Sequence, residues 1–198
     1  FAHESGFNFS KKKVLEFTKK ICATDSDKIF HNSTYDVGWL THHGVPINGR
    51  IIDTMIVAPL IDENQFWFSL NALGREYINE GKSEGELSAA AEEWGLDPKA
   101  DMWRLPSAYV GTYATQDAAL TLKLWNHFKI LLEEQNLWNI FDLEMKVLPV
   151  VLAMKQQGVR VDVQRAESLK EELVKREKTI IKKIKEESGV TEIQLWAA

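Results

Sequence analysis

The sequence contains little cysteine and no long apolar run. Cys22 is the single cysteine among 198 residues, which excludes an internal disulfide framework and a zinc cluster built on cysteines. No segment approaches the roughly 20 consecutive apolar residues of a membrane span, and the first residues lack the charged start and apolar run of a signal peptide. We therefore expect a cytoplasmic protein that does not bind a membrane.

The chain also lacks an excess of positive charge. Its 24 Lys and Arg face 29 Asp and Glu, which gives a net charge of −5 at pH 7. Proteins that hold nucleic acid by bulk electrostatics need bases in excess, so this mode of binding is disfavoured, whereas an enzyme acting on nucleic acid is not excluded. Residues 62–101 carry ten acids against three bases. We expect this acidic segment to face solvent, away from any phosphate backbone.

Helix and strand patterns alternate in the first third of the chain. A helix is predicted from Lys11 to Cys22 with Ser10 as its N-cap, followed by a strand in "KIFHN". The stretch "STYDVGWLTHHG" predicts a helix that ends at Gly44, and "GRIIDTMIVAPL" predicts a strand passing into a helix that Pro59 limits. This alternation indicates an α/β sheet layer.

From Ser69 onward the pattern becomes helical. Two helices are predicted in "SLNALGREYI" and "SEGELSAAAEEW", and in the second Ser83 and Glu86 have the spacing of a capping box. A long helix follows over residues 108–135, and the next, "IFDLEMKVLPVVLAMKQQG", ends at Gly158. The run "VRVDV" predicts a short strand, and "QRAESLKEELVKREKTIIKKIKEESG" predicts a helix of mixed charge.

Two weak patterns place polar side chains where they could share a cleft. In "YATQD", Tyr113 and Asp117 stand four residues apart and therefore share one face of the long helix. Asp36 lies near the start of an earlier helix, where the helix dipole favours an acid in any case. Carboxylates that converge in a cleft repel one another unless cations lie between them, which makes a divalent metal their natural partner. The local pattern leaves both interpretations of Asp36 open.

The order of the motifs is more specific than any one of them. "HNSTYD", "IIDTM" and "YATQDAALTLKLW" resemble, in sequence, the second and third exonuclease motifs of the proofreading domain of family A DNA polymerases. "LEMKVLPVVLAMKQQGVRVDV" is similar to the segment that joins the exonuclease domain to the polymerase domain in that family. These stretches fall within residues 28–165. Within this family, the chain most resembles the enzymes of bacteriophages.

The resemblance implies a fold and a reaction. The fold would be an α/β, ribonuclease H-like exonuclease fold missing its N-terminal strands and followed by long helices. Residues 1–136 would form a partial 3′-5′ exonuclease domain, and residues 137–198 would begin the polymerase domain with its thumb helices. The reaction would be hydrolysis of 3′-terminal nucleotides of single-stranded or frayed DNA, a proofreading step in replication within a bacterial or infected-cell cytoplasm. It would use a two-metal mechanism with Mg²⁺, or alternatively Mn²⁺ or Zn²⁺.

The resemblance also implies a role for individual residues. Asp36 and Asp117 would bind metal, and Asp117 would hold the metal that activates water. Tyr113 would position that water. Asn32 would lie near the 3′-terminal nucleotide, and Tyr35 would shape the wall of the site.

Asp53, in "IIDTM", is the acid that we assign a structural role. It follows a predicted strand and precedes a predicted helix, which is the position of a helix N-cap. We therefore expect Asp53 to cap the helix rather than to bind metal.

One family motif has no counterpart in this chain. The family begins with an Asp-x-Glu on its first strand, whereas the single Asp-x-Glu here, Asp142 to Glu144, follows the third motif and lies inside a predicted helix. We therefore expect a fragment cut at both ends, whose missing acids stood in the removed N-terminal portion, and which cleaves slowly or not at all. Two alternatives remain: a ribonuclease D-like exoribonuclease, which the "GVRVD" run disfavours, and a catalytically dead module supporting a polymerase.

Overall fold

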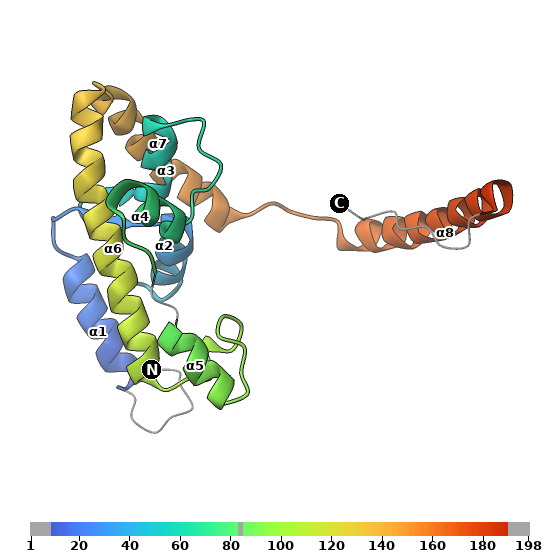
Figure 1. The fold of residues 1–198 in the computed structure, drawn as a ribbon, viewed down its shortest axis with the longest axis horizontal. Coiled ribbons are helices and arrows are strands. Elements are labelled where there is room, and N and C mark those ends of the chain that lie inside the picture. Colours follow the sequence, from blue (N-terminus) through green and yellow to red (C-terminus); the bar gives the residue numbers. More distant parts are fainter. Residues whose placement is uncertain (1–8, 83–84, 190–198) are drawn as a thin grey trace. The chain divides into compact units, whose positions relative to one another are not determined.

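The computed structural model describes residues 9–82 and 85–189, and the chain divides into two compact units, Phe1–Gln156 and Gln157–Ala198. Ser83, predicted to take part in a capping box, lies outside the described residues. The described part of the first unit is mostly helical (Figure 1) and contains a two-stranded sheet. Its elements are α1 (Lys11–Cys22), β1 (Lys28–Phe30), α2 (Ser33–His42), β2 (Ile51–Asp53), α3 (Thr54–Ile61), α4 (Leu70–Ile78), α5 (Gly85–Glu93), a 3₁₀ turn (Met102–Arg104), α6 (Ser107–Glu134) and α7 (Trp138–Gln157).

The sheet consists of two parallel strands, β1 and β2. Ile29 of β1 pairs with Ile52 of β2, and Phe30 pairs with Asp53. Parallel neighbours need a crossover connection, which α2 and the loop after it provide. The carboxyl ends of both strands therefore lie at one edge, and α2 and α3 both begin there. This edge positions the second predicted motif.

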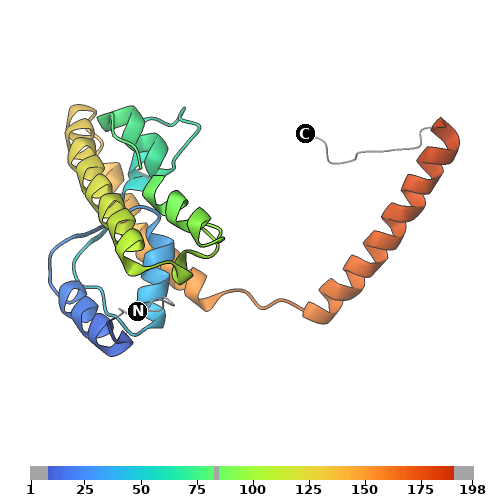
Figure 2. The same ribbon diagram turned by 60° about the horizontal axis from the view of Figure 1, so that its bottom comes forward.

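The long helix α6 links the core to the cleft described below. It packs against α3, α4, α5 and β1 and spans the first unit in both views (Figures 1 and 2). The part of α6 from Leu120 onward and α7 supply much of the main core, from residues Leu120, Leu124, Trp125, Phe128, Leu132, Phe141, Met145, Leu148 and Leu152. Tyr113 and Asp117 precede this apolar stretch on the same helix, so core packing sets the position of both side chains.

The local boundaries agree with the sequence at most helices. Ser10 caps α1 by accepting a hydrogen bond from the backbone N–H of Lys13, as predicted. Pro59 does not end α3 but lies inside it, two residues before the last helical residue. Gly158 follows α7 with a positive φ of 68°, a backbone conformation that glycine adopts without strain.

The strand predicted in "VRVDV" is wrong. Residues 159–162 are not in a strand, and Val163 begins α8 (Val163–Ser188). Asp162 caps that helix, because its carboxylate accepts a hydrogen bond of 2.9 Å from the backbone N–H of Arg165. A strand needs a neighbour for its backbone hydrogen bonds, and in the described part of the chain the sheet contains only β1 and β2.

The second unit consists, in its described part, of the segment leading to α8 and α8 itself. None of the residues of α8 is buried. No helix among the described residues combines the length and the apolar character needed to cross a bilayer.

By contacts, α7 belongs mainly to the first unit, so the compact unit extends beyond residue 136. The division predicted at residue 136, which concerns related domains rather than contacts, stays a prediction.

Candidate active site

A cleft of about 690 Å³ lies where the carboxyl end of β1 meets α6. Four of the five residues singled out from the sequence line it: Asn32, Asp36, Tyr113 and Asp117. The cleft is completed by residues from β1, from the starts of α3 and α4, from the loop after α4 and from α6, namely Ile29, Phe30, His31, Met55, Ser69, Leu70, Lys82, Ala114, Ala118 and Thr121.

Asp53 organises the edge from which Asn32 and Asp36 project. Its side chain is 2% exposed, and its Oδ1 accepts hydrogen bonds of 2.9 Å from the backbone N–H groups of Asn32 and Met55. Its Oδ2 accepts bonds from the backbone N–H and the hydroxyl of Ser33, at 2.6 and 2.7 Å. The predicted cap of α3 is confirmed, and the same carboxylate also satisfies N–H groups at the start of α2.

Asn32 turns the chain from β1 into α2. Its φ of 66° lies in the left-handed region, which asparagine tolerates better than most residues. Its side-chain oxygen accepts a hydrogen bond of 2.9 Å from the hydroxyl of Thr34. Asp36 follows one turn into the helix, so the fixed backbone of Asn32 determines where the Asp36 carboxylate enters the cleft.

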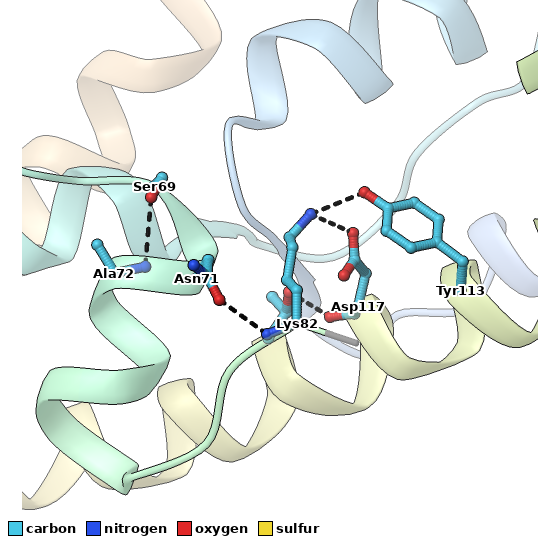
Figure 3. Close-up of polar contacts among 7 residues, drawn as sticks. Ser69, Asn71, Ala72, Lys82, Tyr113 and Asp117 are labelled. Carbon is cyan, nitrogen blue, oxygen red and sulfur yellow. Dashed lines mark hydrogen bonds and ion pairs between the residues drawn. The ribbon is translucent and has the colours of Figure 1, made fainter. Parts of the chain in front are cut away.

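Asp117 and Tyr113 share a partner that crosses the cleft from the loop after α4. The ammonium of Lys82 donates hydrogen bonds to Asp117 Oδ2 at 2.5 Å and to the Tyr113 hydroxyl at 2.9 Å (Figure 3). The backbone N–H of Lys82 in turn donates to Asn71 Oδ1 at 2.9 Å. The three side chains of Lys82, Asp117 and Tyr113 therefore form one connected polar group.

Burial shifts the pKa of several groups in the cleft. It lowers the pKa of Lys82, but the hydrogen bonds to Asp117 and Tyr113 outweigh it, and the net pKa is raised. Burial raises the pKa of Asp36, with a further rise from the charge of Asp53 and an opposing backbone hydrogen bond. The pKa of Tyr113 is also raised by burial, against the opposing effect of Lys82. Lys82 is therefore charged and Tyr113 protonated at neutral pH.

His31 lies at the same strand end. Its Nδ1 is 2.9 Å from the Thr54 hydroxyl, which also donates to the backbone oxygen of Phe30 at 3.1 Å. Burial lowers the pKa of His31, although the charge of Asp53 partly opposes this. A histidine that is mainly neutral at pH 7 adds little charge to the cleft.

Lys82 is the cleft residue that sequence reasoning missed. The segment of residues 62–101, predicted from its acids to face solvent away from any phosphate, contributes Ser69, Leu70 and Lys82 to the lining of the cleft. Gly81 is a weak sequence signal that the loop before Lys82 packs closely against α4. A Cβ at this position would come within 2.8 Å of Arg75 Nε and 2.9 Å of Asn71 Oδ1. No local spacing connects Lys82 with Asp117, because they meet only through the fold.

Tyr35 is the predicted site residue that the structure does not bring into the cleft. Its side chain is 63% exposed and packs edge-to-face on Trp39 at 6.5 Å between ring centroids. Together with Trp39 and His42 it lines a separate depression on the surface. Its assigned role at the wall of the site stays a prediction.

The single Asp-x-Glu of the chain lies on α7. Asp142 accepts a hydrogen bond of 3.1 Å from Arg50, and neither Asp142 nor Glu144 lines the cleft. The absence of a counterpart to the first exonuclease motif stays a prediction.

The cleft offers oxygen ligands for a hard cation. No group of three or more His, Cys, Asp or Glu side chains is placed to hold a metal within the part of the chain that the structure describes. Asp117 Oδ1, however, is buried and makes no hydrogen bond to any described residue. Mg²⁺ is commonly held by one or two carboxylates together with water and substrate phosphates. The donor set of Asp117 and Asp36 therefore fits such an ion.

The cleft thus brings carboxylate and phenol side chains together. The chain belongs to the 3′-5′ exonuclease family of family A DNA polymerases, whose sequence profile matches residues 7–133. It is 31% identical over 190 residues to a DNA-directed DNA polymerase of Pseudomonas phage M6, covering 94% of this chain and 29% of that protein.

Two more distant relatives are also DNA polymerases. The chain is 29% identical to DNA polymerase DpoZ of Acinetobacter phage SH-Ab 15497, over 72% of this chain and 24% of that protein. It is 24% identical to DNA polymerase I of Treponema pallidum, over 66% of this chain and 13% of that protein. The chain thus spans less than a third of the length of these polymerases.

Proposed function

We propose that this chain is the proofreading exonuclease region of a DNA polymerase, with a ribonuclease H-like fold, which hydrolyses the 3′-terminal phosphodiester of single-stranded or frayed DNA. The observation that supports this most is the cleft, where Asn32 and Asp36 of the second motif meet Tyr113 and Asp117 of the third. These residues lie far apart in the sequence and have the chemistry that phosphodiester hydrolysis needs. The relatives are DNA polymerases, which does not favour the ribonuclease D-like alternative.

Each residue has a proposed task in this reaction. Asp117 would hold Mg²⁺, or Mn²⁺ or Zn²⁺, through its unpartnered oxygen, and Asp36 would contribute from α2. When bound, such ions polarise a phosphoryl oxygen and lower the pKa of water in a two-metal mechanism. The Tyr113 hydroxyl, protonated at neutral pH, would orient the attacking water. Asn32 would contact the terminal nucleotide, and Tyr35 would approach from the adjacent surface.

The proposed domain division follows from the same family. Residues 1–136 would be exonuclease, and residues 137–198 would begin the polymerase domain, to which α8 would belong. The length of the relatives supports this, because each is a polymerase several times longer than the matched region. A polymerase domain in the same chain is therefore the proposed partner of this region.

Binding of DNA tests the proposed site most directly. We expect this chain to bind a single-stranded DNA oligonucleotide with a free 3′-hydroxyl more tightly when Mn²⁺ is present, as measured by fluorescence anisotropy. Asp36→Asn and Asp117→Asn should remove the dependence on Mn²⁺. Asp142→Asn is the matched control, because it removes the same charge beside Arg50 and outside the cleft. Equal Mn²⁺ dependence in all variants would overturn the proposed site.

Cleavage and substrate type are measured separately. We expect slow or no shortening of a 5′-labelled DNA oligonucleotide by this chain alone, because two carboxylates hold a pair of dications weakly. Rapid Mg²⁺-dependent shortening from the 3′ end would show that the expectation of inactivity is wrong, and it would support the proposed 3′-5′ hydrolysis. An RNA oligonucleotide of the same sequence, bound more tightly than the DNA, would favour the exoribonuclease instead.

A further inference from the structure

The ammonium of Lys82 contacts Asp117, the residue proposed above to hold a metal ion. Its ammonium lies between the Asp117 carboxylate and the Tyr113 hydroxyl, the two groups assigned to metal and water (Figure 3). The side chains of Lys82 and Asp117 are only 18% and 23% exposed. Among the described residues that line the cleft, Lys82 is the only lysine or arginine. One internal cation therefore neutralises Asp117.

A divalent cation on Asp117 Oδ1 and the Lys82 ammonium on Oδ2 would share one carboxylate, so their positive charges would lie a few ångströms apart. Like charges a few ångströms apart repel strongly where solvent is partly excluded. The lysine side chain can move away, since its charge sits at the end of a flexible four-carbon stem. Its backbone need not move, because the N–H of Lys82 is anchored on Asn71 Oδ1.

We propose that Lys82 is a positioning residue of the cleft: its ammonium holds Asp117 and Tyr113 side by side when no metal is bound and gives up Asp117 to an incoming divalent cation. This inference rests on the proposed role of Asp117 as a metal ligand. A bound metal then replaces the ammonium as the counter-ion of the carboxylate. The affinity of the cleft for metal is set partly by the strength of the contact between Lys82 and Asp117.

A purely structural salt bridge makes a different prediction. In that case removal of Lys82 lowers the stability of the protein and leaves its metal affinity unchanged or weaker. If metal must displace the ammonium, removal of the positive charge strengthens metal binding even where stability falls. Metal affinity therefore separates the two roles.

The experiment is a calorimetric titration of the full 198-residue chain with Mn²⁺ alone, without DNA. We expect Lys82→Met to bind Mn²⁺ roughly tenfold more tightly, as loss of a competing charge-assisted hydrogen bond implies. Lys82→Arg keeps the charge and should not gain affinity. Lys123→Met is the matched control, because Lys123 lies on the same helix as Asp117 and pairs instead with Glu80 at 2.7 Å. It should leave Mn²⁺ affinity unchanged.

Two further variants make the outcome decisive. If Lys82→Met does not fold, as judged by circular dichroism, Lys82→Gln removes the charge while keeping a hydrogen-bond donor, and it should also gain affinity. Unchanged or weaker Mn²⁺ binding in the folded neutral variant, with binding still lost in Asp117→Asn, overturns the role of Lys82 and leaves the proposed function standing. Binding that Asp117→Asn does not alter overturns the proposed metal site itself, and with it this inference.

Discussion

Asp53 and Asp117 are two carboxylates of one unit with opposite surroundings. Asp53 is almost fully buried and accepts four hydrogen bonds from the starts of two helices. Asp117 has one oxygen against a lysine ammonium and a second, buried oxygen with no partner among the described residues. The first arrangement stabilises the fold, because every acceptor is used. The second arrangement leaves one carboxylate oxygen without a hydrogen bond, which is expected of a group that binds a ligand.

The largest effect expected from this comparison is on Asp53. In Asp53→Ala, backbone N–H groups of Asn32, Ser33 and Met55 lose their acceptor, and the Ser33 hydroxyl loses its own. We expect the free energy of unfolding to fall by roughly 3 kcal/mol or more in urea denaturation, since each unsatisfied buried group is costly. Asp97→Asn, at an exposed turn, is the control and should lose much less. Equal losses would contradict the structural role of Asp53.

Ser33 tests one contact of the same carboxylate. The Ser33 side chain is fully buried, and its hydroxyl donates to Asp53 Oδ2 at 2.7 Å. Ser33→Ala removes that bond but keeps the backbone bonds, so we expect a loss of about 1–2 kcal/mol in the free energy of unfolding. In the Asp53→Ala background the same substitution should cost clearly less. Additive losses would mean that the two groups do not act together.

Asp117 should show the reverse balance between stability and binding. We expect Asp117→Asn to lower the free energy of unfolding by no more than about 1–2 kcal/mol, because the amide can still accept a hydrogen bond from the mostly shielded Lys82 ammonium. The enhancement of thermal stability by added Mn²⁺ should disappear in this variant. Differential scanning calorimetry with and without Mn²⁺ measures both quantities. A large loss of stability without any effect on the response to Mn²⁺ would show that Asp117, like Asp53, has a structural role.

The smallest effect is expected at Asp36, whose raised pKa disfavours the charged form in the fold. An acid with a raised pKa destabilises the folded state once pH exceeds the ordinary value of 3.8, and the penalty is complete above the folded pKa. Asp36→Asn should therefore increase stability at pH 7, by less than about 1 kcal/mol because the side chain is partly solvated. The gain should shrink as pH falls toward 3.8, in urea denaturation at a series of pH values. A gain that is constant with pH would show that ionisation is not its cause.

Several parts of the fold follow from short stretches of sequence. The cap of α1 by Ser10 and the cap of α3 by Asp53 each depend on residues a few positions apart, which is why they were predictable. The helical pattern over residues 108–135 likewise predicted α6. Whether "VRVDV" forms a strand was not predictable, because a strand needs a pairing neighbour that the run itself does not specify, and the described sheet consists of β1 and β2.

The candidate site was only partly predictable for the same reason. Tyr113 and Asp117 share a helix face by spacing alone, and the order of the motifs connected them with Asp36 and Asn32. The contact of Lys82 with Asp117 joins two segments of different character, one of them acidic, so composition pointed away from it. Tyr35, beside Asp36 in the sequence, projects elsewhere because adjacent residues diverge on a helix.

The sequence by itself determined the helices, their caps and the motif residues, because hydrophobic period, capping and turn chemistry act over a few neighbouring residues. Even α8, with no buried residue, is capped by Asp162 and followed by Gly189 at a positive φ, as local signals require. Only the tertiary structure decided that one carboxylate is saturated by backbone donors while another faces a lysine. Hydrogen bonding and desolvation depend on which distant groups the packed core brings within 3 Å, and no local pattern contains that information.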